Sequence, residues 1–249
     1  MAAQSWTWFI LFPAVIHCYN NICVPNKCTA TQSSTRGALR ADKVIDGDNL
    51  QFFNRCSHTA ENETGPAWVM VDLGKKYRLK NVTIFYRNDG TDEKDWKPYR
   101  FRKYSLEVFN ASDTQDWTQC HKDNTPDETV PPSIQNISCE MTARFIRIIT
   151  TYDAPENHEH GIAGAILEIC EIKIYGCEIG YYGPDCTSCK NCENCDIVAD
   201  CECPKGFYGR NCSQSCGHCA NDVTCDKVTG ACLSGYCEPG WRNDKRCDL

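Results

Sequence analysis

The 249-residue sequence predicts an all-β protein, with an antiparallel sandwich or barrel followed by small disulfide-rich modules. Two observations lead to this prediction. Short segments rich in β-branched and aromatic residues recur between residues 20 and 176, separated by turn-forming clusters. Beyond them, 14 of the 21 cysteines follow in a much shorter stretch that is poor in apolar residues. The chain therefore divides into a domain with its own core and a tail held by cross-links.

Five segments of the first domain are expected to form strands. They span residues 67–73, 81–86, 104–109, 144–150 and 169–175. Each alternates apolar and polar side chains, as expected of a strand with one face on a core. No convincing amphipathic helix interrupts them. We therefore expect one β-rich domain over residues 20–176.

Cysteine is the repeating element of the tail, residues 177–249. Residues 177–186 and 203–212 share a Cys-x-x-Gly-aromatic pattern that ends on a closing cysteine, and residues 237–247 form a looser copy. Segments this short cannot bury a sufficient core, so disulfides must replace it. The Cys-x-x-Cys spacing within residues 186–195 is also compatible with zinc. The compartment indicated by the N-terminus favours disulfides.

The N-terminus indicates the secretory route. Residues 6–16 form an apolar run that is too short to span a bilayer and is typical of a signal peptide, which we place at residues 1–18. Five Asn-x-Ser/Thr sequons follow as expected glycosylation sites, at Asn62, Asn81, Asn110, Asn136 and Asn211. No second stretch is long enough to cross a membrane. We expect a secreted glycoprotein, and a fragment of a receptor ectodomain remains an alternative.

Charge and motifs exclude several classes of function. The net charge of -7 argues against a general nucleic-acid binder. The sequence contains no nucleophile elbow, phosphate-binding loop or HExxH motif. The run His158-Glu159-His160 resembles a metal motif, but in a polar loop we expect it to be solvated. We therefore expect a protein that is not an enzyme.

A series of motifs narrows the class of the first domain. In chain order they are Ile45-Asp46-Gly47-Asp48, Cys56-Ser57-His58-Thr59, the segment 68–74, Arg87-Asn88-Asp89 and Ile169-Cys170-Glu171-Ile172. Together they resemble the F-type lectin (fucolectin) domain, a jelly-roll relative of the discoidin domain. The cysteine spacing of the tail resembles EGF-like modules of multiple-EGF-like and scavenger-receptor class F proteins. The resemblance implies a discoidin-like jelly-roll sandwich followed by EGF-like modules.

The resemblance also implies a fucose-binding site, because histidine and arginine donate directed hydrogen bonds to sugar hydroxyls. The residues at matching positions are His58, Arg87, Asp89, Arg100, Lys94, Phe52 and Phe53. His58 and Arg87 match two donors, and Asp89 matches the acid that orients Arg87. Two residues compete for the third donor position: the family spacing selects Lys94, and alignment through the next strand selects Arg100. Phe52 or Phe53 would pack against the fucose methyl group, which is worth roughly 1 kcal/mol.

A calcium site and disulfide pairs follow from the same resemblance. The ion would be held mostly by backbone carbonyls. The matching positions are Lys43, Asp46, Asp48, Arg55, Cys170 and Glu171. Arg55 stands where the family usually has a serine, which removes one side-chain ligand. The implied disulfides are Cys56–Cys170 and Cys120–Cys139, and Cys23 and Cys28 are left to pair with each other.

These observations together predict a secreted, calcium-supported lectin that binds terminal fucose on glycans or glycoproteins, in innate recognition or adhesion. The EGF-like tail would serve as a spacer or contact other proteins. One alternative is an adhesion or matrix protein whose discoidin-like domain binds protein or lipid and has lost sugar binding. The long loop after Asp89 and the lack of an adjacent cysteine pair in it favour that alternative. A sugar-active enzyme is the other alternative.

Overall fold

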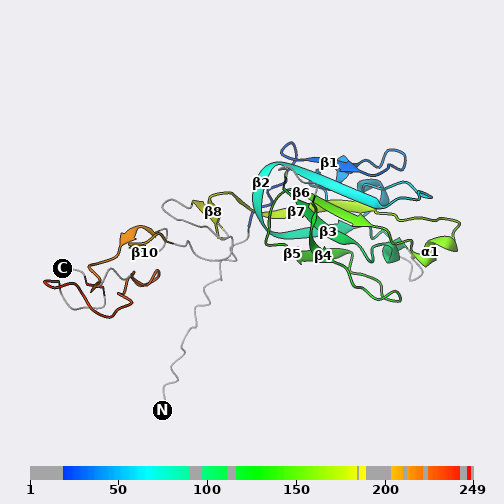
Figure 1. The fold of residues 1–249 in the computed structure, drawn as a ribbon. Coiled ribbons are helices and arrows are strands. Elements are labelled where there is room, and N and C mark those ends of the chain that lie inside the picture. Colours follow the sequence, from blue (N-terminus) through cyan, green and yellow to red (C-terminus); the bar gives the residue numbers. More distant parts are fainter. Residues whose placement is uncertain are drawn as a thin grey trace, which may run out of the picture.

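The first domain is a β-sandwich, and the tail contains four short strands among the residues described (Figure 1). The computed structural model describes residues 19–89, 97–110, 116–183, 185–188, 203–209, 212–220, 224–241 and 246–247. The expected signal peptide, Lys94 and the sequon asparagine Asn211 lie outside these residues. Within them, no helix is long and apolar enough to cross a membrane.

Seven of the described strands build the sandwich. They are β1 (Thr29–Gln32), β2 (Ala67–Tyr86), β3 (Ser105–Phe109), β4 (Thr118–Lys122), β5 (Ile134–Ser138), β6 (Thr142–Thr150) and β7 (Ile169–Glu178). Short helical turns connect them: η1 (Ala41–Ile45), η2 (Phe53–Arg55), η3 (Lys97–Arg100) and α1 (Pro155–His158). The expected all-β class is confirmed.

Strand β2 belongs to both layers of the sandwich. Its first part pairs antiparallel with β1 and β6, and its second part pairs with β5 and β7. The sequence predicted two separate strands, 67–73 and 81–86, but the structure has one strand that continues through a bend. At the bend Gly74 adopts a φ of +77°, and the pairing register with β6 shifts before Tyr77. Glycine adopts this conformation without steric cost, so the strand can turn without ending.

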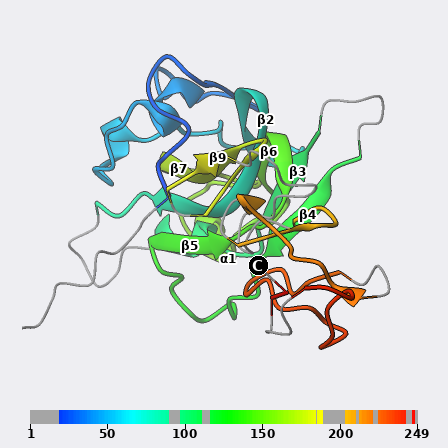
Figure 2. The same ribbon diagram turned by 90° about the vertical axis from the view of Figure 1, so that its left-hand side faces the viewer.

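The strands form two layers (Figure 2), and the side chains between them form one apolar core. One layer has the order β1-β2-β6-β3-β4, and β5 and β7 pair with the second part of β2 to form the other. Alternate side chains of the central strands point inward and are fully buried, as on β2 and β6. Strands β1, β4 and β5 were not predicted because most of their side chains are polar and at least partly exposed.

Disulfides connect both parts of the chain internally. The first domain contains Cys56–Cys170 and Cys120–Cys139, the pairs that the resemblance implied, and Cys23–Cys28, the pair expected from the two remaining cysteines. In the described tail the pairs are Cys177–Cys186, Cys203–Cys212, Cys216–Cys225, Cys219–Cys232 and Cys237–Cys247. This density of disulfides fits an extracellular environment.

The repeated cysteine pattern of the tail corresponds to a repeated local structure. In each copy the first and last cysteines are bonded to each other. The glycines at the fourth position of the copies, Gly180, Gly206 and Gly240, have φ of 88°, 90° and 94°. In the first two copies a two-residue strand follows the glycine: β8 (Tyr181–Tyr182) pairs with β9 (Thr187–Ser188), and β10 (Phe207–Tyr208) pairs with β11 (Gln214–Ser215). The glycine makes the turn and the disulfide closes it.

Candidate functional site

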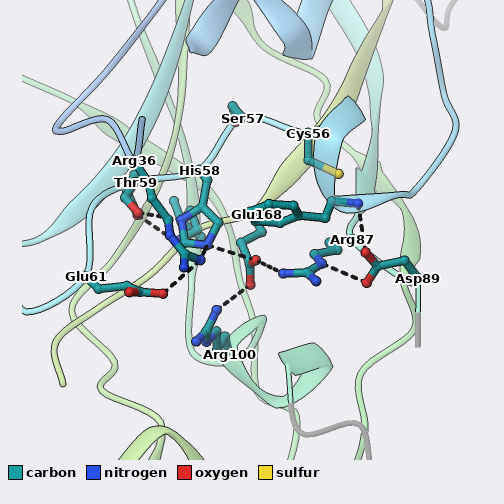
Figure 3. Close-up of polar contacts among 12 residues, drawn as sticks. Arg36, Cys56, Ser57, His58, Thr59, Glu61, Arg87, Asp89, Arg100 and Glu168 are labelled. Carbon is teal, nitrogen blue, oxygen red and sulfur yellow. Dashed lines mark hydrogen bonds and ion pairs between the residues drawn. The ribbon is translucent and has the colours of Figure 1, made fainter. Parts of the chain in front are cut away.

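Three basic side chains converge on one buried carboxylate at the end of the sandwich (Figure 3). The Oε1 atom of Glu168 lies 3.0 Å from His58 Nε2 and 2.6 Å from Arg87 Nη1. Its Oε2 atom lies 2.7 Å from Arg100 Nη1. Of the two residues proposed for the third basic position, Arg100 joins this cluster, whereas Lys94 lies outside the described residues.

Backbone hydrogen bonds hold the segments that carry these side chains. On one side of Glu168, Ser57 N donates to Ile169 O at 2.7 Å and Thr59 N donates to Leu167 O at 3.1 Å. On the other side, the N–H of Arg87, the residue after β2, donates to the carbonyl of Glu168 at 3.0 Å. The site is therefore assembled by strand-like pairing between distant segments.

Glu168 is ionised at the centre of the cluster. Burial alone raises the pKa of its carboxyl group, but the hydrogen bond and charge of His58 and the charges of Arg100 and Arg87 hold that pKa well below its usual value. The hydroxyl of Tyr86 lies 3.5 Å from Oε2, and burial together with the Glu168 charge raises the pKa of Tyr86. Positive charge around Glu168 thus outweighs its desolvation.

The ring of His58 is fixed from both sides. Its Nδ1 lies 2.5 Å from the carbonyl oxygen of Thr59, and its Nε2 faces the Glu168 carboxylate. Both of these neighbours are hydrogen-bond acceptors, and they hold the ring in one orientation. Arg36 Nη1 lies 3.3 Å from the same Nε2 and 3.0 Å from Glu61 Oε1.

Asp89 orients Arg87, as the resemblance implied. Its carboxylate accepts hydrogen bonds from Arg87 Nε and from Phe53 N, both at 2.8 Å. The Arg87 guanidinium carbon lies 4.5 Å from the centre of the Phe53 ring, within the range of a cation–π contact. The Phe53 ring also meets the His58 ring edge-on at 5.9 Å. Phe53 is therefore part of the site, and Phe52 beside it is exposed.

The cluster is largely closed to solvent. The side chains of His58 and Arg100 are 1% and 3% exposed, and that of Glu168 is fully buried. Arg87 is 11% exposed and is the member through which the cluster reaches the surface. Arg36 is 44% exposed and its guanidinium lies 5.4 Å from the Phe53 ring. We use the term rim for the surface formed by Arg36, Phe52, Phe53 and Arg87.

Sequence reasoning missed Glu168, Arg36 and Asn157. Glu168 lies in an apolar run that leads into β7, where a lone acidic residue is easily taken for an outward-facing position. The available signal was a single carboxylate inside that run. The predicted sugar site had more basic residues than acidic residues to pair with them. Asn157, in α1, accepts a hydrogen bond from Arg100 Nε at 2.7 Å and is fully buried.

The positions implied for calcium lie around the loop after η1. Gly47 N donates to Glu171 Oε2 at 3.3 Å, which brings this loop to β7. Lys43 Nζ donates to Asn54 O at 2.9 Å, and Arg55 Nη1 pairs with Asp48 Oδ2 at 3.3 Å. Cys170, which is disulfide-bonded, offers only backbone atoms. No three acidic, histidine or cysteine side chains among the described residues group as a metal site.

Glu171 nevertheless lies in a setting that disfavours its charged form. Burial of its side chain, together with the charges of Asp46 and Asp48, raises its pKa to about 7, against the opposing hydrogen bond from Gly47 and the charge of Lys173. A buried carboxylate flanked by two others is a setting in which a bound cation would offset repulsion. The donor set fits a hard cation only if backbone carbonyls supply the remaining ligands.

The other sequence candidates take ordinary positions. His158 is the last residue of α1 and not part of a loop, but it is exposed as expected, with its Nε2 2.9 Å from Asp153 Oδ2. Asn62 is exposed and accepts a hydrogen bond from Ala163 N at 3.0 Å. Asn110 follows β3, and the remaining described sequons lie on β2 and β5.

The fold is a discoidin-like β-sandwich. Residues 43–148 match the family model described as "NedA-like, galactose-binding domain". That description is of a binding module and not of an enzyme family.

The chain is also similar to several solved structures and, over short segments, to two curated proteins. A fucolectin from striped bass (Morone saxatilis) serum has a TM-score of 0.49 and 21% identity, covering 64% of this chain and 49% of that one. A Streptococcus pneumoniae fucose binding module has a TM-score of 0.48 and 19% identity, covering 64% and 96%. The Danio rerio angiopoietin-1 receptor is 47% identical over 47 residues, 19% of this chain and 4% of that protein.

A mouse (Mus musculus) EGF-like and EMI domain-containing protein 1 is 46% identical over 54 residues. This match covers 22% of the chain and 8% of the relative. The chain therefore spans less than a tenth of the length of either curated relative, and the similarity to them is local.

Proposed function

We propose that the first domain binds carbohydrate, with terminal fucose as its ligand, at the rim above the Glu168 cluster. The observation that carries this proposal is the convergence of His58, Arg87 and Arg100 from three separate segments on one point. The match of residues 43–148 to a galactose-binding domain model supports a sugar as the class of ligand.

The rim offers the two kinds of contact that a deoxy sugar requires. Arg87 and Arg36 present guanidinium groups, which donate directed hydrogen bonds to hydroxyls. Phe52 and Phe53 present apolar surface beside them, against which a methyl group would pack. Because Glu168 occupies His58 and Arg100, we assign them the role of fixing Arg87 in place, and not that of direct donors to the sugar.

Substitution of Arg87 by alanine tests this assignment. We expect the affinity for fucose, measured by titration calorimetry, to fall by roughly 10- to 100-fold, because a hydrogen bond to a charged donor contributes about 1.5–3 kcal/mol. Phe52→Ala should also weaken binding, and since Phe52 is exposed this variant should leave the fold intact.

Arg144→Ala is the matched control, because Arg144 pairs with Asp72 on the side of the sandwich and lies in no part of the rim. Its affinity for fucose should equal that of the unmodified protein. If neither Arg87→Ala nor Phe52→Ala changes fucose binding, the rim is not the sugar site. If the unmodified protein shows no preference for fucose on a glycan array, the proposal itself fails.

The closure of the cluster favours a second candidate function, adhesion through protein or lipid contacts. With His58 and Arg100 nearly inaccessible, the cluster can serve only to hold loops in place. In that case the array would show no sugar binding. Arg87→Ala would lower stability for either candidate, because Arg87 pairs with the buried Glu168, so the array and not the stability of the variant separates the two.

We also propose that calcium binds between the loop after η1 and β7. Backbone carbonyls at the matching positions Lys43, Asp46, Asp48, Arg55, Cys170 and Glu171 would supply most of the ligands, and the carboxylate of Glu171 would supply another. The support is the buried, like-charged surrounding of Glu171. Calcium would hold the loop that leads to η2 and Phe53.

Removal of calcium should lower the melting temperature. For a single site at 100 times its Kd the expected difference is roughly 3 kcal/mol, or several degrees for a chain of this size. Thermal melts in calcium and in a chelator measure it, with magnesium as the control ion. Glu171→Gln should abolish the difference. Identical melts in calcium and chelator would contradict the site.

We further propose that the protein is secreted and that the tail consists of EGF-like modules that space the domain or contact other proteins. The disulfide density and the repeated glycine–disulfide unit support this. Binding of a single sugar is typically weak, so useful affinity would come from several copies acting together.

A further inference from the structure

Two glycosylation sequons face each other across the ladder between β2 and β5. Asn81-Val82-Thr83 lies on β2 and Asn136-Ile137-Ser138 lies on β5, with Asn81 opposite Ser138 and Thr83 opposite Asn136. The middle residues Val82 and Ile137 are paired and point into the core. Strand alternation therefore places both asparagines on the outer face of the same two strands.

The two acceptor side chains are in direct contact. Asn81 Nδ2 donates to Asn136 Oδ1 at 2.6 Å, and Thr83 Oγ1 donates to the same oxygen at 3.3 Å. Asn136 is exposed and Asn81 is half-buried. β5 pairs only with β2 among the described strands, so the open side of Asn136 faces away from the sheet. Both amide nitrogens thus compete for one small area of surface.

We propose that Asn81 and Asn136 form one glycosylation site that carries a single glycan in the folded protein. A sugar attached to Asn81 Nδ2 or Asn136 Nδ2 occupies the space outside this pair of side chains. Two attached sugar rings, each roughly as wide as the spacing of about 5 Å between strands, would force the side chains apart and break their hydrogen bond. A chain that carries both glycans would have to give up pairing along β5.

The chemistry is ordinary asparagine glycosylation with a lipid-diphosphate-linked oligosaccharide as donor. The amide nitrogen forms a bond to the anomeric carbon, the bond from that carbon to the diphosphate oxygen breaks, and the amide proton is released as the lipid diphosphate leaves. The inference requires passage through the compartment that holds this donor, which is part of the proposed function, but it does not depend on sugar binding at the rim.

The order of synthesis favours Asn81 as the occupied residue. It precedes Asn136 by 55 residues. At about 5–20 residues per second it is available to the transferase several seconds earlier. The glycan would then cover the outer face of β2 and β5 and leave the rim, which lies at the end of the sandwich, open to ligand.

The test is the number of glycans on the full chain secreted from a eukaryotic cell line. Intact-protein mass spectrometry counts the glycans, and enzymatic release in heavy-oxygen water marks the occupied asparagines. The variants are Asn81→Gln, Asn136→Gln and the double variant. We expect each single variant to carry as many glycans as the unmodified protein, because the remaining asparagine is used instead. The double variant should carry one fewer.

The matched control is Asn62→Gln, since Asn62 lies in a loop with no sequon asparagine beside it among the described residues. If Asn62 is occupied, this variant should lose one glycan with no compensation elsewhere. Unmodified protein that carries glycans on both Asn81 and Asn136, with each single variant losing one, would overturn the proposal. A double variant with an unchanged glycan count would overturn it as well, because neither residue would then be a site.

Discussion

Replacement of Glu168 by glutamine is expected to destabilise the first domain by about 3–5 kcal/mol. The reason is that Glu168 is the common partner of His58, Arg87 and Arg100, and all four side chains are buried or nearly so. Removing one partner of a buried ion pair leaves the remaining charge without compensation, which is the costly case. Here one substitution leaves two guanidinium groups and an imidazole gathered around a neutral amide.

The free energy of unfolding, measured by denaturant titration, tests this prediction. Glu140→Gln is the matched control, because Glu140 pairs with Lys80 on the surface and such pairs contribute roughly 0–1 kcal/mol. If Glu168→Gln unfolds within about 1 kcal/mol of the unmodified protein, the cluster does not hold the loops, since a loss of 3–5 kcal/mol is a large share of ordinary stability.

The same carboxylate predicts loss of stability in acid. The folded-state pKa of Glu168 lies well below its ordinary value of 4.5. Its contribution to the free energy of unfolding is therefore complete above about pH 4.5 and is lost as the pH falls further. In that range Glu168 binds a proton in the unfolded chain but remains ionised in the folded chain. One such group changes the free energy of unfolding by about 1.4 kcal/mol per pH unit in that window. Denaturant titrations at pH 6, 4 and 3 should show a smaller acid loss for Glu168→Gln than for the unmodified protein.

Removal of the Cys56–Cys170 disulfide is the second large effect that we expect. The bond joins residues 114 positions apart, and it lies two positions before His58 and two after Glu168. In the chain-entropy model a loop of this length contributes about 4–5 kcal/mol, and loss of native disulfides typically costs about 2–5 kcal/mol. The double variant Cys56→Ala with Cys170→Ala is preferred, because both sulfurs are buried and serine would bury a hydroxyl.

The Cys23–Cys28 pair provides the internal control, since it spans only 5 residues. The same model gives roughly 2 kcal/mol for so short a loop. Denaturant titration of the two double-alanine variants should rank Cys56–Cys170 as the more stabilising bond. Equal losses would show that loop length does not govern the contribution of these disulfides.

Part of the fold followed from the sequence, and the reason for the rest is physical. The central strands were predicted because their inward faces are apolar, as on β6 and β7. The edge strands β1, β4 and β5 have too few buried side chains to produce that signal. Gly74 led to the prediction of a turn between two strands, whereas in the structure it only bends β2. A glycine adopts a positive φ both in a turn and at a bend, so the sequence does not distinguish the two.

The sequence predicted the basic residues of the candidate site but not the central carboxylate to which they bind. His58, Arg87 and Asp89 were found through motifs, and Arg100 was one of two candidates for the remaining position. Glu168 was not found, since its role arises only when segments far apart in sequence pair around it. Burial also changed the interpretation, because His58, Arg87 and Arg100, which were expected to face a ligand, are instead paired with Glu168.

The continuous course of β2 has a consequence for how this domain unfolds. A sandwich whose layers share no strand can in principle lose one layer while the other persists. Here the backbone of β2 is hydrogen-bonded in both layers, so neither can be lost without leaving part of the same strand unpaired. The layers should therefore behave as a single cooperative unit, and partial opening should be confined to the loops at the two ends.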